Sequence, residues 1–220
     1  MRQVVILVER QTEEALVNEV LGPAASMRGT YVTPVVVTTS ATPTGAHHGG
    51  GHWKHYHATL QALLKASHYE RVGLLLDYYQ YPKGAPGREV PSPSESLDSA
   101  SRQSALMTAL RAEYPDPRFR PLVVLHEIEA LVLAAIDAGQ GNELLPEQGL
   151  ADLRQAITRA GGPERVNDGP STAPSKRLEA ADPGYMKTVV GPQLVSEAGL
   201  PAVLERCPTF KDWCEKDLLA

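Results

Sequence analysis

The sequence predicts an α/β protein with a mostly parallel sheet flanked by helices and a mainly helical C-terminal extension. Short apolar, β-branched runs recur along the chain, and segments with helical spacing separate them. A continuous apolar run is typical of a strand that is buried on both faces of a parallel sheet. We expect the α/β core at residues 1–140 and the extension at residues 141–220, packed together as one structural unit.

The first strand is predicted at residues 4–8, directly before Glu9. A helix should follow, because residues 16, 17, 20 and 21 are apolar and keep helical spacing. Thr12 is the expected N-cap of this helix. The pair Gly22-Pro23 is expected to end it.

The second strand is predicted at residues 35–39, and a loop rich in Thr, Pro, Gly and His is expected at residues 41–51. A second helix should begin after this loop. Its apolar face is marked by Trp53, Tyr56, Leu60, Leu63 and Leu64.

The remaining strands are predicted at residues 72–76, directly before Asp77, and at residues 121–125. The helix expected between them covers residues 99–112, and an apolar helix at residues 130–136 should follow the last strand. Strands that alternate with helices in this way predict crossover connections and parallel pairing.

The composition excludes several classes of protein. No segment approaches the roughly 20 apolar residues of a membrane span, and the N-terminal run is too short for a signal peptide. Cys207 and Cys214 are expected to be reduced thiols of a cytoplasmic protein. The net charge of −5 argues against coating nucleic acid through bulk electrostatics, so contact with DNA or RNA should be local, metal-assisted or shared with a more basic partner.

Acidic residues follow three of the predicted strands: Glu9, Asp77, and the pair Glu127 and Glu129. A single acid at such a place is more often a helix cap, but three strands that end alike favour a site. Because the carboxyl ends of parallel strands meet at one edge, these carboxylates should repel one another unless a cation binds. Oxygen ligands favour Mg²⁺ or Mn²⁺ over zinc. Glu13 suits this site and, about equally, the positive end of a helix dipole.

Short sequence blocks over nearly the whole chain carry a family resemblance. Residues 8–14, Val8-Glu9-Arg10-Gln11-Thr12-Glu13-Glu14, look like the opening V-E-G-x-T-E-E of a bacterial TOPRIM-like family, domain of unknown function forty-two seventy-six. Further blocks that match in order are residues 76–79, 125–131, 166–169, 172–178, 185–187 and 207–213.

The resemblance implies a TOPRIM-type fold, similar to that of topoisomerases, primases and the nucleases of the overcoming-lysogenization-defect group. By that similarity, Glu9 and Glu13 would be the first acidic pair and Asp77 the middle acid. Glu127 and Glu129 would form the third acidic element. Together these five side chains would hold Mg²⁺ or Mn²⁺.

The same resemblance implies that Lys176 faces the scissile phosphate, so Lys176 and Glu9 are the expected catalytic residues. Arg10, Lys176 and Arg177 would bind phosphate. An exposed helix start after Pro174 explains the basic residues at 176 and 177 about equally well.

Two positions depart from the family pattern. Tyr79 stands where the TOPRIM D-x-D motif has its second acid, and Arg10 replaces a glycine. If a metal binds, His126 or the acids after the last strand must compensate for the acid missing at position 79.

Other polar groups of the sequence have simpler interpretations. The histidine-rich segment, with His47, His48, His52, His55 and His57, is interpreted as a Gly/His segment that caps the second helix rather than as a metal site. Residues 49–51 offer backbone N–H groups to an anion, but no P-loop motif follows them. Tyr78, Tyr79 and Tyr81 are expected to pack or stack, and Asn167-Asp168-Gly169 predicts a tight turn.

The leading hypothesis is a Mg²⁺- or Mn²⁺-dependent nuclease that acts on DNA or RNA. The resemblance further implies an ABC- or SMC-like ATPase partner in bacterial anti-phage defence, and a homo-oligomer is compatible with it. The alternative hypothesis is a non-catalytic interaction subunit that binds a partner or a phosphorylated ligand at the same edge of the sheet.

Overall fold

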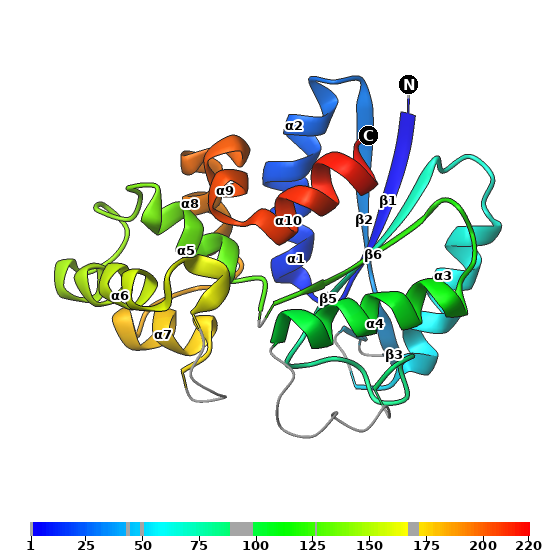
Figure 1. The fold of residues 1–220 in the computed structure, drawn as a ribbon, viewed down its shortest axis with the longest axis horizontal. Coiled ribbons are helices and arrows are strands. Elements are labelled where there is room, and N and C mark those ends of the chain that lie inside the picture. The colour runs from blue at the N-terminus through cyan, green and yellow to red at the C-terminus, as the bar shows by residue number, and fades with distance from the viewer. Residues whose placement is uncertain (1, 43–44, 49–50, 89–98, 126, 167–171) are drawn as a thin grey trace.

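A four-stranded parallel sheet forms the centre of the fold (Figure 1). The computed structural model describes residues 2–42, 45–48, 51–88, 99–125, 127–166 and 172–220. The strands lie in the order β2-β1-β5-β6, and each neighbouring pair is parallel. Their bounds are β1 (Arg2–Val8), β2 (Thr30–Val36), β5 (Arg71–Asp77) and β6 (Phe119–Val124). The predicted α/β fold is therefore confirmed.

Both faces of the sheet are buried, which explains the continuous apolar runs. In β1, Val5 and Leu7 belong to one hydrophobic core, whereas Ile6 and Val8 belong to the other. Helices of the first core are α3 (Trp53–Lys65) and α4 (Ser99–Glu113), and those of the second include α1 (Gln11–Leu16) and α5 (Ala130–Asp137). The predicted helices that follow the second, third and fourth strands are confirmed.

The order of the strands creates a switch point. The chain passes from β1 to β2 at one edge, then returns beyond β1 to β5 and continues to β6. The direction of winding therefore reverses between β1 and β5. In open parallel sheets, ligands bind outside the carboxyl ends of the strands at such a point.

The C-terminal third of the chain is mainly helical, as predicted, and packs on α5 and on one face of the sheet (Figure 1). Its elements are α6 (Glu147–Ala160), η2 (Pro163–Arg165), α7 (Pro174–Ala181), α8 (Val190–Ala198), α9 (Leu200–Arg206), α10 (Pro208–Asp212) and η3 (Trp213–Leu218). The buried Trp213 donates its indole N–H to Arg120 O at 3.0 Å. Gly73 in β5 makes room for this ring, since a Cβ there would lie 3.3 Å from Trp213 Cζ2.

The first helix does not begin as predicted. Its N-cap is Arg10, in an extended conformation, and Thr12 lies inside the helix. The cap is provided by Glu13, whose Oε2 accepts the Arg10 N–H at 3.0 Å. A Thr next to two acids predicts a cap from composition alone, but here the acid three positions beyond Arg10 satisfies the open backbone group.

The helix also does not end at Gly22-Pro23. A π-helical turn, η1 (Val17–Leu21), leads directly into α2 (Gly22–Ser26). The Gly22 N–H donates to Val17 O, five residues back, so the wider turn carries the chain past the proline. Pro23 then stands in the first turn of α2, where its missing N–H costs little.

The second strand begins earlier than predicted and the expected loop contains a hairpin. β2 ends at Val36, and β3 (Thr38–Thr42) pairs antiparallel with β4 (Gly45–His48). Pro34 made β2 difficult to predict, because proline is uncommon within strands. It is tolerated because β2 is an edge strand, where one row of backbone groups needs no partner.

The two ends of the described chain lie side by side. Arg2 donates to Leu219 O at 3.4 Å and to Ala220 O at 2.6 Å. Cys207 and Cys214 are buried free thiols, as predicted. Among the described residues, no helix is long and apolar enough to cross a membrane.

Candidate functional site

Five acidic side chains come together at the switch point, at the carboxyl ends of three strands. Each of the other four raises the pKa of the Asp77 carboxyl through its negative charge. Four of the five are at most 9% exposed, and Asp77 is partly exposed. The acidic cluster comprises Glu9 after β1, Glu13 in α1, Asp77 at the end of β5, and Glu127 and Glu129 between β6 and α5. The structure therefore places the five predicted acids near enough to interact through their charges, and their role as ligands stays a prediction.

Glu13 belongs to this cluster and does more than stabilise a helix dipole. Its pKa is raised from 4.5 to about 7, chiefly by burial and also by the charges of Glu9 and Glu129, while hydrogen bonds from the backbone N–H groups of Glu13 and Arg10 oppose the rise. A carboxyl with a pKa near 7 is about half protonated at neutral pH. It is therefore ready to exchange its proton for a cation.

Asp77 connects β5 to the turn before α5. Its Oδ1 accepts the backbone N–H of Ile128 at 3.0 Å. Burial, and then the four neighbouring acids, raise its pKa well above the ordinary value. Ionisation of this group without a bound cation is therefore unfavourable.

Glu127 and Glu129 are held by different parts of the C-terminal region. Glu127 Oε2 accepts the backbone N–H of Ser175, at the start of α7, at 2.8 Å. Glu129 Oε1 lies 3.3 Å from Lys187 Nζ. Burial raises the pKa of Glu129 although Lys187 opposes the change. The C-terminal helices thus fix the acids of the last strand.

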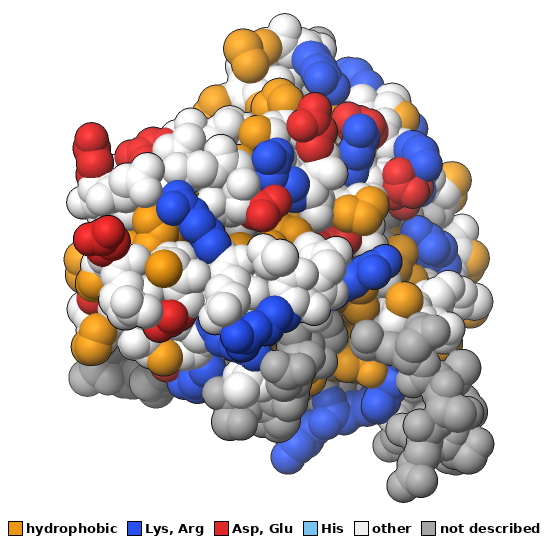
Figure 2. Space-filling view, turned by 60° about the vertical axis from the view of Figure 1, so that its left-hand side comes forward, with side chains coloured by type: hydrophobic (Ala, Val, Ile, Leu, Met, Phe, Trp, Pro, Cys, Tyr) orange, Lys and Arg blue, Asp and Glu red, His pale blue; other side chains and the backbone are white. Residues whose placement is uncertain are grey.

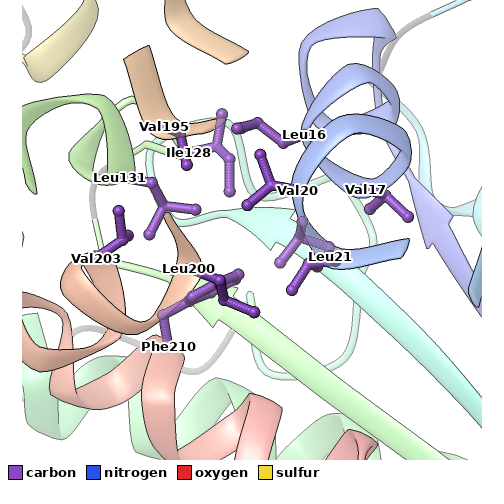
Figure 3. Close-up of a pocket in the computed structure, with 11 residues that line it drawn as sticks. Leu16, Val17, Val20, Leu21, Ile128, Leu131, Val195, Leu200, Val203 and Phe210 are labelled. Carbon is purple, nitrogen blue, oxygen red and sulfur yellow. The ribbon is translucent and has the colours of Figure 1, made fainter. Parts of the chain in front are cut away.

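Ile128, between these two acids, points into the core. It lines a small apolar cavity of about 10 Å³ together with Leu131 and Val195, and Figure 3 shows side chains of several helices pointing toward one another there. That volume admits one water-sized probe, and the lining offers no polar partner. The cavity is a gap in the packing that surrounds Ile128, rather than a ligand site.

Two half-exposed cations flank the acidic cluster. Arg10 Nη2 lies 3.2 Å from Glu9 Oε1 and also donates to Gln80. At the other side, the negative charge of Glu129 raises the pKa of Lys187 against the effect of burial. Each cation offsets part of the negative charge and remains accessible from solvent.

A family model described as domain of unknown function (DUF4276) matches residues 8–216. The chain belongs to this family. No curated protein and no solved structure gave a match. The DUF4276 match begins at the last residue of β1 and ends within η3, so it includes the whole acidic cluster and the helices that hold it.

Of the predicted basic residues, Arg10 contacts the acidic cluster, whereas Lys176 and Arg177 have other partners. Lys176 is exposed and pairs with Glu179 at 2.7 Å, and Arg177 donates to Thr172 O at 2.9 Å. Glu179 also lies 3.5 Å from Lys187 Nζ. Lys187, which was not predicted, is the lysine seen to contact the acidic cluster, and its position in the matching block at residues 185–187 was the available signal.

Two histidines of the described residues have other contacts or places in the fold. His57 Nδ1 hydrogen-bonds to Tyr114, and His52 is the N-cap of α3 without a side-chain cap bond. His126, the side chains of His47 and His48, Gly49-Gly50 and the turn at residues 167–169 lie outside the described residues.

The composition of the acidic cluster fits a hard divalent cation, because its members are all carboxylates and their negative charges raise the pKa of Glu13 and Asp77. Within the described ranges, no three His, Cys, Asp or Glu side chains already have the arrangement of a complete ion site. Ion binding would therefore require the carboxylates to move closer together.

Proposed function

We propose that this chain is a Mg²⁺- or Mn²⁺-dependent phosphodiesterase of TOPRIM type that cleaves nucleic acid. The observation that supports it is the group of five carboxylates around Asp77 at the switch point. Buried like charges destabilise one another, and a divalent cation would relieve this repulsion. A Glu after the first strand and acids after later parallel strands also support the TOPRIM likeness.

The side chains would divide the work as follows. Glu9, Glu13, Asp77, Glu127 and Glu129 would hold the ion. A bound ion would supply an activated water and neutralise charge on the phosphate. Arg10 and Lys187, half-exposed beside the acids, would bind the phosphate oxygens once the ion replaces them as partners of Glu9 and Glu129. Lys176 and Arg177 would contact the phosphate backbone farther out.

The charge distribution supports delivery of the substrate by a partner. Basic and acidic side chains are interspersed on the face shown in Figure 2, and the net charge is −5. Such a surface attracts duplex DNA weakly. An ABC- or SMC-like ATPase that presents the nucleic acid, in a system of anti-phage defence, would provide the missing attraction.

The test is a nicking assay on plasmid DNA and on RNA with Mg²⁺ or Mn²⁺, with and without the proposed ABC- or SMC-like ATPase. Asp77→Asn keeps the acceptor for the Ile128 N–H but removes the charge, so we expect at least about a 100-fold loss of cleavage. Asp217→Asn is the control, because Asp217 forms a surface pair with Arg111 at 3.3 Å. Equal cleavage by both variants, or none by the wild type under any condition, refutes the proposal.

A second candidate is a non-catalytic subunit that binds a partner or a phosphorylated ligand at the same edge. The pairing of Arg10 with Glu9 favours it, because an arginine already occupies the position of a cation. Tyr79 in place of an acid also favours it. Calorimetric titration with Mn²⁺ separates the two candidates: binding that Asp77→Asn abolishes supports the enzyme, whereas no binding supports the subunit.

A further inference from the structure

A second pocket lies directly beyond the end of β5, next to the acidic cluster. Its volume is about 430 Å³, within the range of small-ligand sites. One of its lining residues is Tyr78, which directly follows Asp77 in the chain. The lining residues are Tyr78, Tyr79, Tyr81, Arg88, Arg102 and Leu106. Three aromatic rings and two guanidinium groups thus surround one space, and the proposed phosphodiesterase chemistry leaves them without a role.

The aromatic side of the pocket is held in place by hydrogen bonds and ring contacts. The Tyr78 N–H donates to Val124 O at 3.1 Å, and the Tyr81 hydroxyl donates to Pro86 O at 2.7 Å. The rings of Tyr78 and Tyr79 meet edge to face, with centroids 5.9 Å apart. Since these rings are fixed before any ligand arrives, a flat ligand can stack on them without a large loss of side-chain entropy.

The basic side of the pocket stands out in an acidic protein. Arg102, on α4, lies 5.6 Å from the ring centroid of Tyr78. Both Arg88 and Arg102 are exposed, and within the part of the chain that the structure describes no carboxylate pairs with either. A planar guanidinium binds phosphate through two parallel hydrogen bonds. The pocket therefore offers aromatic faces and anion-binding groups together.

We infer that this pocket binds an unpaired nucleotide of a single-stranded nucleic acid, with its base on the tyrosine rings and its phosphate at Arg102 and Arg88. A base can stack on a side chain only when it has left its own helical stack, so the pocket selects single strands over duplexes. The inference rests on the proposed function in one respect: the bound strand is the substrate, because the pocket adjoins Asp77.

Binding is tested by fluorescence anisotropy with labelled 12-mers of oligo(dT) and oligo(U) and a blunt duplex of equal length. EDTA is present, so neither metal nor cleavage is needed. We expect both single strands, or one of them, to bind at least about tenfold more tightly than the duplex. Arg102→Gln should weaken that binding at least about fivefold, whereas Arg111→Gln, on the same helix, should leave it unchanged.

A second pair of variants isolates the stacking contact. Tyr79→Phe keeps the ring and should bind as the wild type does, whereas Tyr79→Leu should bind at least about fivefold more weakly. Equal affinity for duplex and single strand, equal binding by Arg102→Gln and Arg111→Gln, or equal binding by the two Tyr79 variants overturns the inference. If the wild type binds single strands in this way but cleaves neither DNA nor RNA, only the proposed function is contradicted.

Discussion

Replacement of Glu13 by Gln should stabilise the protein at alkaline pH. The substitution keeps an oxygen that accepts the Arg10 N–H, now 3.0 Å from Glu13 Oε2, so the helix cap persists. It removes a buried carboxyl group whose pKa is raised from 4.5 to about 7. The effect on stability can therefore be assigned to ionisation.

The sign and size follow from proton linkage. Between pH 4.5 and 7 the folded protein retains a proton on Glu13 that the unfolded chain has released, so stability falls as the pH rises through this interval. The difference between the folded and unfolded pKa of Glu13 lowers the free energy of unfolding by about 3 kcal/mol in all. Most of this loss, roughly 2.5 kcal/mol, develops between pH 5 and 8. The raised pKa values of Asp77 and Glu129 act in the same direction.

The assay is urea unfolding at pH 5 and pH 8 in EDTA, for the wild type, Glu13→Gln and the control Glu19→Gln. Glu19 is exposed on the same helical segment. We expect Glu13→Gln to exceed the wild type by about 2–3 kcal/mol at pH 8 and by less than about 1 kcal/mol at pH 5. A variant that is less stable than the wild type at pH 8, or that shows the same pH dependence, would refute the reasoning.

Substitutions at three further positions test the contacts that hold the site in place. Gly149→Ala would place a Cβ 2.2 Å from Ala181 O, so α6 and α7 must separate. We expect the free energy of unfolding, measured by thermal denaturation, to fall by about 3 kcal/mol. Glu164→Ala leaves the two N–H groups at the start of α10 without their acceptor. Urea unfolding should therefore show a fall of about 3 kcal/mol in the free energy of unfolding, and a smaller fall for Glu164→Gln. Lys187→Met leaves Glu129 without this lysine, so the free energy of unfolding should fall by about 1 kcal/mol at pH 8. The fall should be smaller at acidic pH, because the raised pKa of Glu129 favours its neutral form there.

The sequence predicted the centre of the fold because strands buried on both faces produce continuous apolar runs. The run at residues 72–76 could hardly be anything else, and it became β5. The predicted helix and strand bounds were wrong where the same residue type is compatible with two local structures. Pro23 can end a helix or begin one, and only the π-helical turn before it decides between them. The hairpin of β3 and β4 was not predicted, because its Thr residues occur in strands and in loops, and the nearby Gly and Pro indicate a loop.

The acidic residues of the site were predictable because each of Glu9, Asp77 and Glu127 follows a strand, and parallel strands bring their carboxyl ends together. Arg10, a predicted basic residue, lies beside Glu9, but the lysine in contact with the acids was not predicted. Whether Lys176 or Lys187 turns toward the acids depends on how the loop before α8 returns to the sheet. No periodicity in the sequence reports such a long-range contact.

The alternation of Glu127, Ile128 and Glu129 links the precision of the site to the integrity of the core. The outer two side chains belong to the acidic cluster, while the middle one is 2% exposed among apolar side chains of η1, α5, α8 and α9. A core substitution that shifts Ile128 would displace both carboxylates at once, as well as the N–H that Asp77 accepts. If the cluster binds an ion as proposed, heating that loosens these helices should abolish that binding before the sheet itself melts, while the protein is still largely folded.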